Sequence, residues 1–341
     1  MKVAVLMGGI SQERNVSIAG GLAVMKAMEE LDFEAIAVDP AYGKDGIRNL
    51  GELEIITDPP TEEELSEFNS RSYIDCVNSE IFDDIDVVFN VLHGTFGEDG
   101  RIQALFELRG IPCTGSGTMA NAIGMDKYVS KMLFTVNQIP TPPYDFLDNS
   151  LVGDYDYYAE LRDNFGGQIV IKPNDQGSTV GVTMVLDGNL DMIHEGCQNA
   201  LKYSDTVLLE RYIPGREITV GVIGGEALPI VEIVPQSGFY DYEAKYSGGQ
   251  SEYVCPADLP QDVIEFTQNM ALSAYTACSC DGFARVDFRL TEDFQPFILE
   301  INTVPGFTAT SLVPMAAAAT GQDFASLCKE IIQIAIKKEI E

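Results

Sequence analysis

Two stretches near the carboxyl end of the chain alternate polar and apolar side chains. Residues 283–290 read Phe-Ala-Arg-Val-Asp-Phe-Arg-Leu, and residues 296–302 read Pro-Phe-Ile-Leu-Glu-Ile-Asn. This alternation is typical of strands, because successive side chains of a strand point to opposite faces. Residues 291–295 between them are turn-like, so we expect the two stretches to pair as a hairpin. Their polar faces are the most informative part of the chain for chemistry.

Folding this hairpin about its middle places Asp287 opposite Glu300 and Arg285 opposite Asn302. Two opposed carboxylates repel each other on a sheet, and a bound divalent cation would remove that penalty. Asp, Glu and Asn offer only oxygen ligands, which suits Mg²⁺ or Mn²⁺ carrying the phosphates of a nucleotide and does not suit zinc. The alternative is a solvated polar face, because a one-residue slip in register would separate these side chains.

A second group of residues is cationic. Lys127 lies on a predicted helix that also carries Lys131, and Lys172 ends an apolar strand. The loop that follows, residues 173–181, reads Pro-Asn-Asp-Gln-Gly-Ser-Thr-Val-Gly, and its backbone amides could wrap phosphate oxygens. It is not a Walker loop, since no Gly-Lys-Ser/Thr follows. A plain hairpin turn is the alternative interpretation.

A third group lies where two predicted strands end. The first strand runs into Gly8-Gly-Ile-Ser-Gln-Glu-Arg14, which lacks the Gly-x-Gly-x-x-Gly spacing of dinucleotide-binding proteins and argues against a nicotinamide dehydrogenase. Glu13 fits recognition of a ligand ammonium, or it is simply an acid favoured at a helix N-terminus. His93 also follows a strand, and only this position distinguishes it from a structural histidine.

A fourth segment combines polar aromatic residues with a glycine pair. Residues 239–249 read Phe-Tyr-Asp-Tyr-Glu-Ala-Lys-Tyr-Ser-Gly-Gly. A loop of this composition could order over a site, and an ordinary surface loop fits equally well.

The elements that must position these residues begin with an alternation of strand and helix. Strands are expected at residues 3–7, 33–38 and 86–92, with a helix over 16–28. This order predicts a doubly wound, parallel α/β unit whose functional loops lie at the carboxyl ends of its strands. Residues 57–84, rich in proline and acid, are predicted to be an inserted surface excursion.

The remainder of the chain is predicted to be α+β. An amphipathic helix over 324–336, capped by Asp323, should close the chain. We divide the chain into domains 1–115, 116–209 and 210–341. The expected strands of the last two domains are 168–172, 182–186, 217–223, 227–234, 283–290 and 297–302.

The composition of the chain limits its possible binding partners and indicates its cellular compartment. The 53 Asp and Glu residues against 21 Lys and Arg give a net charge of −32, which disfavours nucleic acid and anionic membranes as partners. The seven cysteines are odd in number and scattered, which favours free thiols in a reducing cytoplasm. No apolar run approaches the roughly 18 residues of a membrane span.

Taken in order, these motifs resemble those of the D-alanine–D-alanine ligases of the ATP-grasp superfamily along nearly the whole chain. One such string is weak evidence, whereas eleven in the family's order are strong. The matching stretches are Gly8-Gly-Ile-Ser-Gln-Glu-Arg14, Leu92-His-Gly94, Gly97-Glu-Asp-Gly100, Gly115-Ser-Gly117, Met125-Asp-Lys127, Ile171-Lys-Pro173, Gly177-Ser-Thr-Val-Gly181, Tyr240-Asp-Tyr-Glu-Ala-Lys-Tyr246, Arg285-Val-Asp287, Glu300-Ile-Asn-Thr-Val-Pro-Gly306 and Ser311-Leu-Val-Pro-Met315.

The resemblance implies an ATP-grasp fold and a role for each matching position. Lys127 and Lys172 would contact nucleotide phosphates, with Ser178, Thr179 and Val180 in the loop that closes over them. The metal ligands and the adenosine segment follow from the same match: Asp287, Glu300 and Asn302 for Mg²⁺ or Mn²⁺, and Glu210, Tyr212, Ile213 and Glu217 for adenosine.

The substrate residues also follow from the resemblance. Glu13, with His93 nearby, would hold the ammonium of the first D-alanine, and Arg285 with the Gly306 amide would stabilise the anionic intermediate. The second amino acid would be held by a set comprising Ser311, Leu312, Tyr246 and Ser178. Tyr246 resembles dipeptide-forming rather than D-lactate-using members.

The implied reaction is ATP-dependent ligation of two D-alanines through an acyl phosphate, for peptidoglycan precursor synthesis. A related ligase taking D-serine or D-lactate as second substrate is the near alternative, and a nucleotide-binding regulator without turnover is a more distant one. The resemblance also implies a cytoplasmic homodimer.

Overall fold

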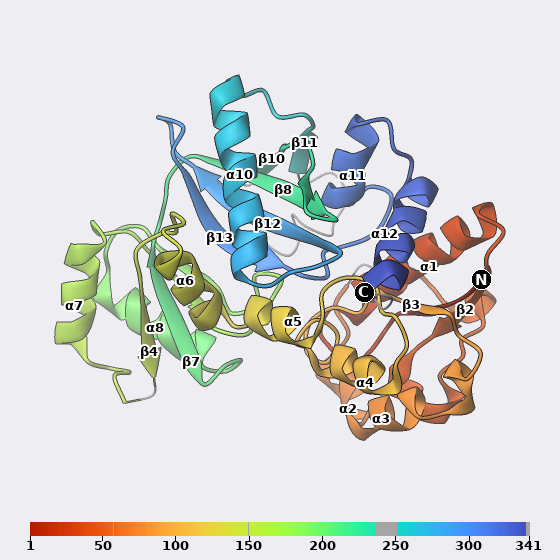
Figure 1. Ribbon diagram of the computed structural model, residues 1–341. Helices are drawn as coiled ribbons and strands as arrows, with labels where there is room; N and C mark the ends of the chain where they lie inside the picture. Colours follow the sequence, from red (N-terminus) through yellow and green to blue (C-terminus); the bar gives the residue numbers. More distant parts are fainter. Residues whose placement is uncertain (57, 149, 236–250, 339–341) are drawn as a thin grey trace.

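The computed structural model describes residues 1–56, 58–148, 150–235 and 251–338. These residues form three β-sheets, each with helices packed against it (Figure 1). The mixture of a parallel sheet with two antiparallel ones confirms the predicted combination of α/β and α+β architecture.

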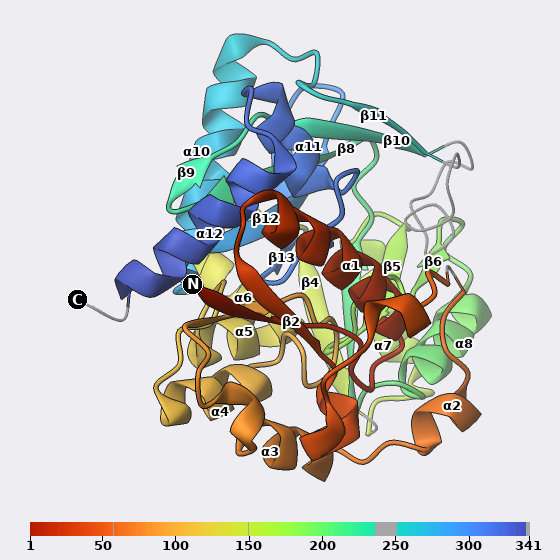
Figure 2. The same ribbon diagram turned by 90° about the vertical axis from the view of Figure 1, so that its right-hand side faces the viewer.

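The N-terminal sheet is parallel and has the strand order β2-β1-β3. Its two faces have separate cores because the side chains of β1 alternate: Val3 and Val5 pack with one cluster, and Ala4 and Leu6 with the other. Helix α1 and the C-terminal helix α12 lie side by side on the first face, and α3 and α4 cover the second (Figures 1 and 2). The doubly wound unit is therefore confirmed. Its elements are β1 (Lys2–Leu6), α1 (Arg14–Glu30), β2 (Glu34–Val38), α3 (Arg71–Val77), β3 (Val87–Asn90), α4 (Arg101–Arg109) and α12 (Phe324–Lys338).

The prediction that residues 57–84 form a surface excursion is wrong for their second half. Helix α2 (Glu62–Ser66) has no buried residue, as expected from its acids. Tyr73, Cys76 and Val77, however, are buried against the N-terminal sheet. Their spacing of three and four residues is that of one helix face. The acidic stretch before them hid this pattern.

The second sheet is antiparallel, with the order β4-β7-β5-β6, and helices α7 and α8 pack against it. Strands β4 and β7 were not predicted. Strand β7 is a continuous buried run rather than an alternating one, so it gives no period-2 signal. The elements are β4 (Tyr144–Asp148), α7 (Tyr155–Asn164), β5 (Ile169–Pro173), β6 (Thr183–Val185), α8 (Leu190–Ala200) and β7 (Thr206–Arg211).

The third sheet has the order β11-β10-β8-β12-β13, with the short β9 beside β8. Helix α10 packs on one face of it. The expected single strand over 227–234 is broken at Pro229, which has no N–H to donate to a neighbouring strand. The elements are β8 (Arg216–Ile223), β9 (Glu226–Ala227), β10 (Val231–Pro235), β11 (Ser251–Val254), α10 (Gln261–Ala277), β12 (Phe283–Leu290), β13 (Pro296–Asn302) and α11 (Leu312–Ala319).

The predicted register of the β12–β13 hairpin is confirmed. Asp287 pairs with Glu300 and Arg285 with Asn302, and a bulge follows Asp287. The cap of helix α12 is confirmed as well, because the Ser326 amide donates to Asp323 Oδ1 at 2.7 Å.

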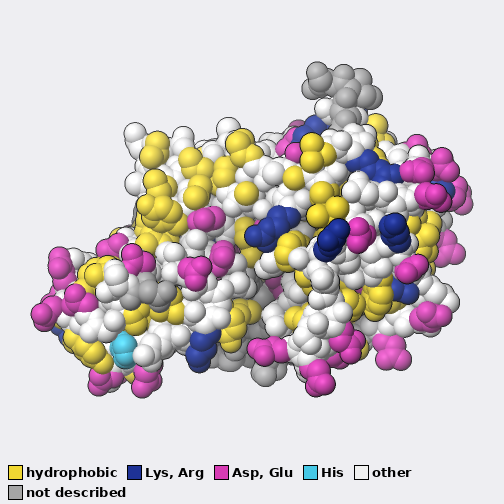
Figure 3. All heavy atoms as spheres, turned by 90° about the horizontal axis from the view of Figure 1, so that it is seen from below, with side chains coloured by type: hydrophobic (Ala, Val, Ile, Leu, Met, Phe, Trp, Pro, Cys, Tyr) yellow, Lys and Arg dark blue, Asp and Glu magenta, His cyan; other side chains and the backbone are white. Residues whose placement is uncertain are grey.

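Acidic side chains are spread across the face shown in Figure 3, and Lys and Arg are few there. All seven cysteines are free. Among the described helices, none combines the length and the apolar character that crossing a membrane would need.

Candidate active site

A cleft lies between the second and third sheets, and ten of the predicted site residues line it. Its empty volume is about 870 Å³, counting space open to solvent. These ten residues are Lys127, Lys172, Ser178, Thr179, Glu210, Tyr212, Ile213, Glu217, Asp287 and Glu300. Asn302 lines a smaller adjoining pocket with Lys127 and Glu300. Val180 is not among the lining residues of either pocket.

Asp287 is the centre of a polar network on β12 and β13. Its carboxylate accepts hydrogen bonds from Arg285 Nε and Nη2, both at 2.8 Å, and from Asn302 Nδ2 at 2.9 Å. Thr219 of β8 also donates to it at 2.6 Å. Glu300, on the paired strand, lies 3.5 Å from Lys127 Nζ. The two carboxylates are thus each partnered by cations or donors, which offsets the repulsion that their register imposes.

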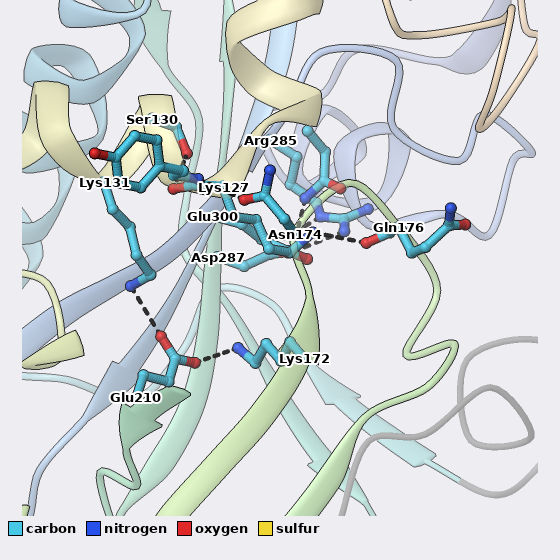
Figure 4. Close-up of polar contacts among 12 residues, drawn as sticks. Lys127, Ser130, Lys131, Lys172, Asn174, Gln176, Glu210, Arg285, Asp287 and Glu300 are labelled. Carbon is cyan, nitrogen blue, oxygen red and sulfur yellow. Dashed lines mark hydrogen bonds and ion pairs between the residues drawn. The ribbon is translucent and has the colours of Figure 1, made fainter. Parts of the chain in front are cut away.

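Lysines from two elements converge on one buried carboxylate (Figure 4). Glu210 is 1% exposed and forms ion pairs with Lys172 and with Lys131, the latter at 2.9 Å. Burial alone would raise the pKa of the Glu210 carboxyl, but the two lysines outweigh it and hold that pKa below its usual value. Burial also opposes the charge of Lys172, yet its acidic neighbours raise its pKa overall. Glu210 and Lys172 are therefore charged at neutral pH.

Near Tyr212 and Ile213, the cleft is lined by apolar side chains and by the guanidinium of Arg289. Arg289 lies over the Tyr212 ring at 5.5 Å and donates to the Ile213 carbonyl at 3.0 Å. It also approaches Glu217 at 3.4 Å. The apolar side chains of this end, Val170, Met184 and Leu299, come from three different strands. Such a slot suits a flat heteroaromatic ring with hydrogen-bonding edges.

The loop between β5 and β6 is strained and reaches the N-terminal unit. Ser178 and Thr179 have φ of 49° and 65°, a left-handed conformation uncommon for non-glycine residues. Ser178 Oγ donates to Glu13 Oε1, and a Cβ added to Gly177 would lie 3.1 Å from Glu13 Oε2. Strain of this kind clusters at ligand clamps. The loop thus connects the lysine-lined cleft to the expected ammonium site.

Glu13 lies among further ionisable groups at this end of the cleft. His93 is buried, and burial lowers its pKa despite the charge of Glu13, so its imidazole is neutral at pH 7. Burial and the charge of Glu13 together raise the pKa of Glu98 to about 8. Glu98 Oε1 accepts a hydrogen bond from the Gly94 amide at 2.9 Å. The Glu98 carboxyl is therefore kept protonated near neutrality.

The raised pKa of Glu98 predicts a pH-dependent stability. Between the unfolded pKa of 4.5 and the folded value of about 8, the folded protein holds a proton that the unfolded chain has lost. Glu98 therefore lowers the free energy of unfolding as pH rises through this window, and it adds no further slope above about pH 8. We expect Glu98→Gln to flatten this decline, measured by urea unfolding from pH 5 to 8 without nucleotide. Parallel curves for the variant and the parent would contradict the prediction.

The loop carrying Glu13 is fixed from the N-terminal sheet and from α3. Asp39 is 2% exposed, accepts from the Gly9 amide at 3.0 Å and pairs with Arg14 at 2.6 Å. Tyr73 Oη accepts from the Ile10 amide at 3.1 Å. Residues of α3, expected at the surface, thus help to position the loop that holds Glu13.

Tyr73→Phe should destabilise the protein and disturb this loop. The change leaves the Ile10 N–H without its acceptor, at a cost of about 1–3 kcal/mol in the free energy of unfolding. Urea titration would measure that loss. Tyr155→Phe is the matched control, because Tyr155 Oη only donates to the exposed Asp191. Equal small losses in both variants would contradict the role of Tyr73.

Three predicted positions lie at the start of α11 or in the loop before it. Ser311 occupies the N-cap position of this helix without a side-chain capping hydrogen bond, and its hydroxyl accepts from the Thr308 amide and bonds Thr308 Oγ1, both at 2.9 Å. Leu312 packs its side chain in an apolar cluster with Val231 and Ile233, so only its backbone could serve a ligand. A Cβ added to Gly306 would lie 3.5 Å from Ser311 Oγ, which places these residues together. Tyr246 lies outside the described residues.

The structure adds residues that were not singled out from the sequence. Lys131 was named as a neighbour of Lys127 but given no role, although it lies one helical turn further on. Arg289 alternates with Arg285 and Asp287 on the same face of β12, a signal visible in the sequence. Gln176 and Thr219 carried no comparable signal.

Comparison with known proteins adds a consistent set of similarities. The family described as D-ala D-ala ligase N-terminus matches residues 2–116, and D-ala D-ala ligase C-terminus matches residues 133–333. A D-alanine--D-alanine ligase of Bordetella petrii is 40% identical, over 99% of this chain and 93% of its own. Among solved structures, the Bacillus anthracis ligase complexed with ATP has a TM-score of 0.78 at 28% identity, covering 100% and 99% of the two chains. The VanG D-Ala:D-Ser ligase of Enterococcus faecalis has a TM-score of 0.77 at 26% identity, covering 98% and 99%.

Proposed function

The chain belongs to the D-alanine–D-alanine ligase family, and from this we infer that it joins two D-alanines with ATP, through an acyl phosphate, in peptidoglycan precursor synthesis. The observation that carries the inference is the cleft itself. It sets Lys127 and Lys172 against Asp287 and Glu300, and its loop reaches Glu13. Lysines, carboxylates and the loop to Glu13 thus meet in one place, which supports the proposal.

In the first step a carboxylate oxygen of the first D-alanine attacks the γ-phosphorus of ATP, and ADP leaves. A carboxylate is a poor acyl donor, and the resulting acyl phosphate carries a good leaving group. Lys127 and Lys172 would neutralise phosphate charge during this transfer. Ser178, Thr179 and the neighbouring Val180 would supply the phosphate-covering loop. The adenosine would be held by Glu210, Tyr212, Ile213 and Glu217.

Asp287, Glu300 and Asn302 would hold the divalent cation. Their donor set fits Mg²⁺ or Mn²⁺, since the register brings two carboxylates to opposed positions beside an amide. When bound, the cation supplies charge neutralisation to the phosphates. The same residues are poor zinc ligands, because they offer no nitrogen or sulfur donor except amide nitrogen.

In the second step the deprotonated amine of the second D-alanine attacks the acyl carbonyl, and phosphate leaves. Glu13 would hold the first ammonium, with the neutral His93 beside it. Arg285 and the Gly306 amide would stabilise the oxyanion that develops. Ser311 and the Leu312 backbone would hold the second carboxylate. The 177–181 loop and the segment with Tyr246 would exclude water, which hydrolyses acyl phosphates.

D-Serine as the second substrate is the alternative that a specific observation favours. A D-Ala:D-Ser ligase shares the fold over 98% of this chain. D-Lactate is the third candidate. Tyr246 is one of the residues that would decide between these substrates. D-Alanine remains the proposal because the D-alanine--D-alanine ligase of Bordetella petrii is 40% identical to this chain, against 26% for the D-Ala:D-Ser ligase.

We further propose three domains, a cytoplasmic location and a homodimer. The boundaries 1–115, 116–209 and 210–341 follow the order of the three sheets, although β7 runs two residues past the second boundary. The use of ATP and the free thiols support the cytoplasm. The homodimer rests on family resemblance alone.

One assay tests the function directly. Purified protein is incubated with ATP, Mg²⁺ and D-alanine, and both phosphate release and product mass are followed. We expect one phosphate per D-alanyl-D-alanine formed. Phosphate release only on addition of D-serine or D-lactate would keep the reaction class and change the substrate. No release with any D-amino acid would refute the ligase assignment.

A further inference from the structure

Lys131 is a charged side chain that the proposed mechanism does not use. It lies on helix α6 (Lys127–Val136), one turn after Lys127, and it is 0% exposed. Lysine is almost never fully buried unless it is paired, because its ammonium loses its hydration. Its burial therefore requires partners that compensate for the lost hydration.

These partners come from three different positions along the chain. Lys131 Nζ lies 2.9 Å from Glu210 Oε2 on β7 and donates to Thr141 Oγ1 at 2.7 Å. The ammonium also lies 5.3 Å from the centre of the Tyr144 ring on β4. Lys172 takes the other oxygen of Glu210, so this carboxylate is held from both sides (Figure 4).

Lys131, Glu210 and Lys172 form a triad. Its charge balance determines whether the Lys172 side chain is available to a phosphate. Two lysines share one buried carboxylate, so Glu210 does not depend on the Lys172 ammonium alone. Without Lys131, the 1%-exposed Glu210 would rely on Lys172 alone, and Lys172 would be drawn away from any phosphate. With Lys131 present, Glu210 already has a second lysine as its partner.

The same ammonium also links the two sheets that form the cleft. Thr141, which accepts from Lys131, donates in turn to the Ile298 carbonyl at 2.8 Å. Ile298 lies on β13, two residues before Glu300. The path therefore runs from Glu210 in the second sheet, through Lys131, to the strand that carries the expected metal ligands.

We propose that Lys131 is a positioning residue of the nucleotide site, which holds Glu210 and leaves the charge of Lys172 available to nucleotide phosphates. This rests on the proposed use of ATP but not on the identity of the amino acids. Lys131 touches neither substrate, so its replacement should weaken ATP binding specifically rather than disturb the amino-acid sites.

Lys131→Met tests this, since methionine is similar in length and carries no charge. We expect the Kd for ATP, measured by calorimetry with Mg²⁺ and no D-alanine, to rise roughly tenfold or more, since one partner of a buried charge pair is lost. The KM for ATP should rise with it, while the KM for D-alanine stays within about twofold, a change worth only ~0.4 kcal/mol. Lys329→Met, at an exposed position of α12, is the matched control and should leave both unchanged.

A second variant separates positioning from mere stability. Lys131→Met/Glu210→Gln removes both buried charges, so it should recover much of the thermal stability lost in the single variant. It should bind ATP about as well as Glu210→Gln alone, because no carboxylate remains to draw Lys172 away from the phosphates. If Lys131→Met fails to fold, Lys131→Gln takes its place in the same measurements. A lowered melting temperature with an unchanged Kd for ATP would overturn the proposal. An equal rise of both KM values would overturn it too. ATP binding by the parent protein without peptide formation would instead refute the proposed function and leave this inference standing.

Discussion

Glu300→Gln is expected to reduce kcat roughly a thousandfold, about 4 kcal/mol of barrier at 1.36 kcal/mol per tenfold. Glutamine keeps the shape of the side chain and one oxygen, but it loses the negative charge that would hold the cation. Glu300 lines both the cleft and its adjoining pocket, opposite Asp287, so no other described carboxylate occupies the equivalent position. The kcat is measured by coupled ADP release at saturating ATP and D-alanine.

The fold should survive this change. In the metal-free protein, removing one of two opposed carboxylates relieves repulsion, and this offsets the lost ion pair between Glu300 and Lys127. The melting temperature without ligand should therefore change little. Glu292→Gln is the matched control, because Glu292 is an exposed carboxylate in the turn of the same hairpin. Near-normal activity of Glu300→Gln would show that the metal assignment is wrong. A collapse of stability would show that Glu300 is structural.

The part of the site that the sequence predicts is the part that rests on regular local geometry. The β12–β13 register follows from alternation and a short turn, so the sequence predicts Asp287 opposite Glu300, and the structure confirms this pairing. Lys172 was likewise placed at a strand end next to a loop, and the loop lies where expected. Short-range rules suffice where the partners are close in the chain.

Contacts between distant elements could not be predicted in the same way. Glu13 and Ser178 are 165 residues apart, and Lys131 meets Glu210 only after two sheets have packed together. Nothing in either local pattern specifies the other. The role of Tyr73 was missed for a related reason: an acidic exposed stretch precedes it, and that composition masked a short helix face. The sequence therefore predicts secondary structure better than it predicts the packing between units.

Arg285→Met should lower kcat by about 10²–10³-fold, the usual effect of removing one donor from an oxyanion site. Arg285 donates to both oxygens of Asp287 in a bidentate arrangement, which fixes the guanidinium next to the expected metal site. Its charge would meet the negative charge that develops when the second amine attacks the acyl carbonyl. Arg285→Lys should recover only part of the rate, because an ammonium cannot reproduce the planar fork.

Two mechanisms could produce such a loss, and a metal titration separates them. If Arg285 stabilises the oxyanion, its removal lowers kcat but does not weaken Mg²⁺ binding, since Asp287 loses a competing cation and keeps Thr219 and Asn302 as partners. If Arg285 only orients Asp287, the Mg²⁺ concentration for half-maximal activity should rise, and saturating Mg²⁺ should restore the rate. Arg162→Met, which breaks the pair with Asp163 on α7, should leave kcat near that of the parent. A rate restored by Mg²⁺ would therefore assign Arg285 to the metal site and remove it from the oxyanion site.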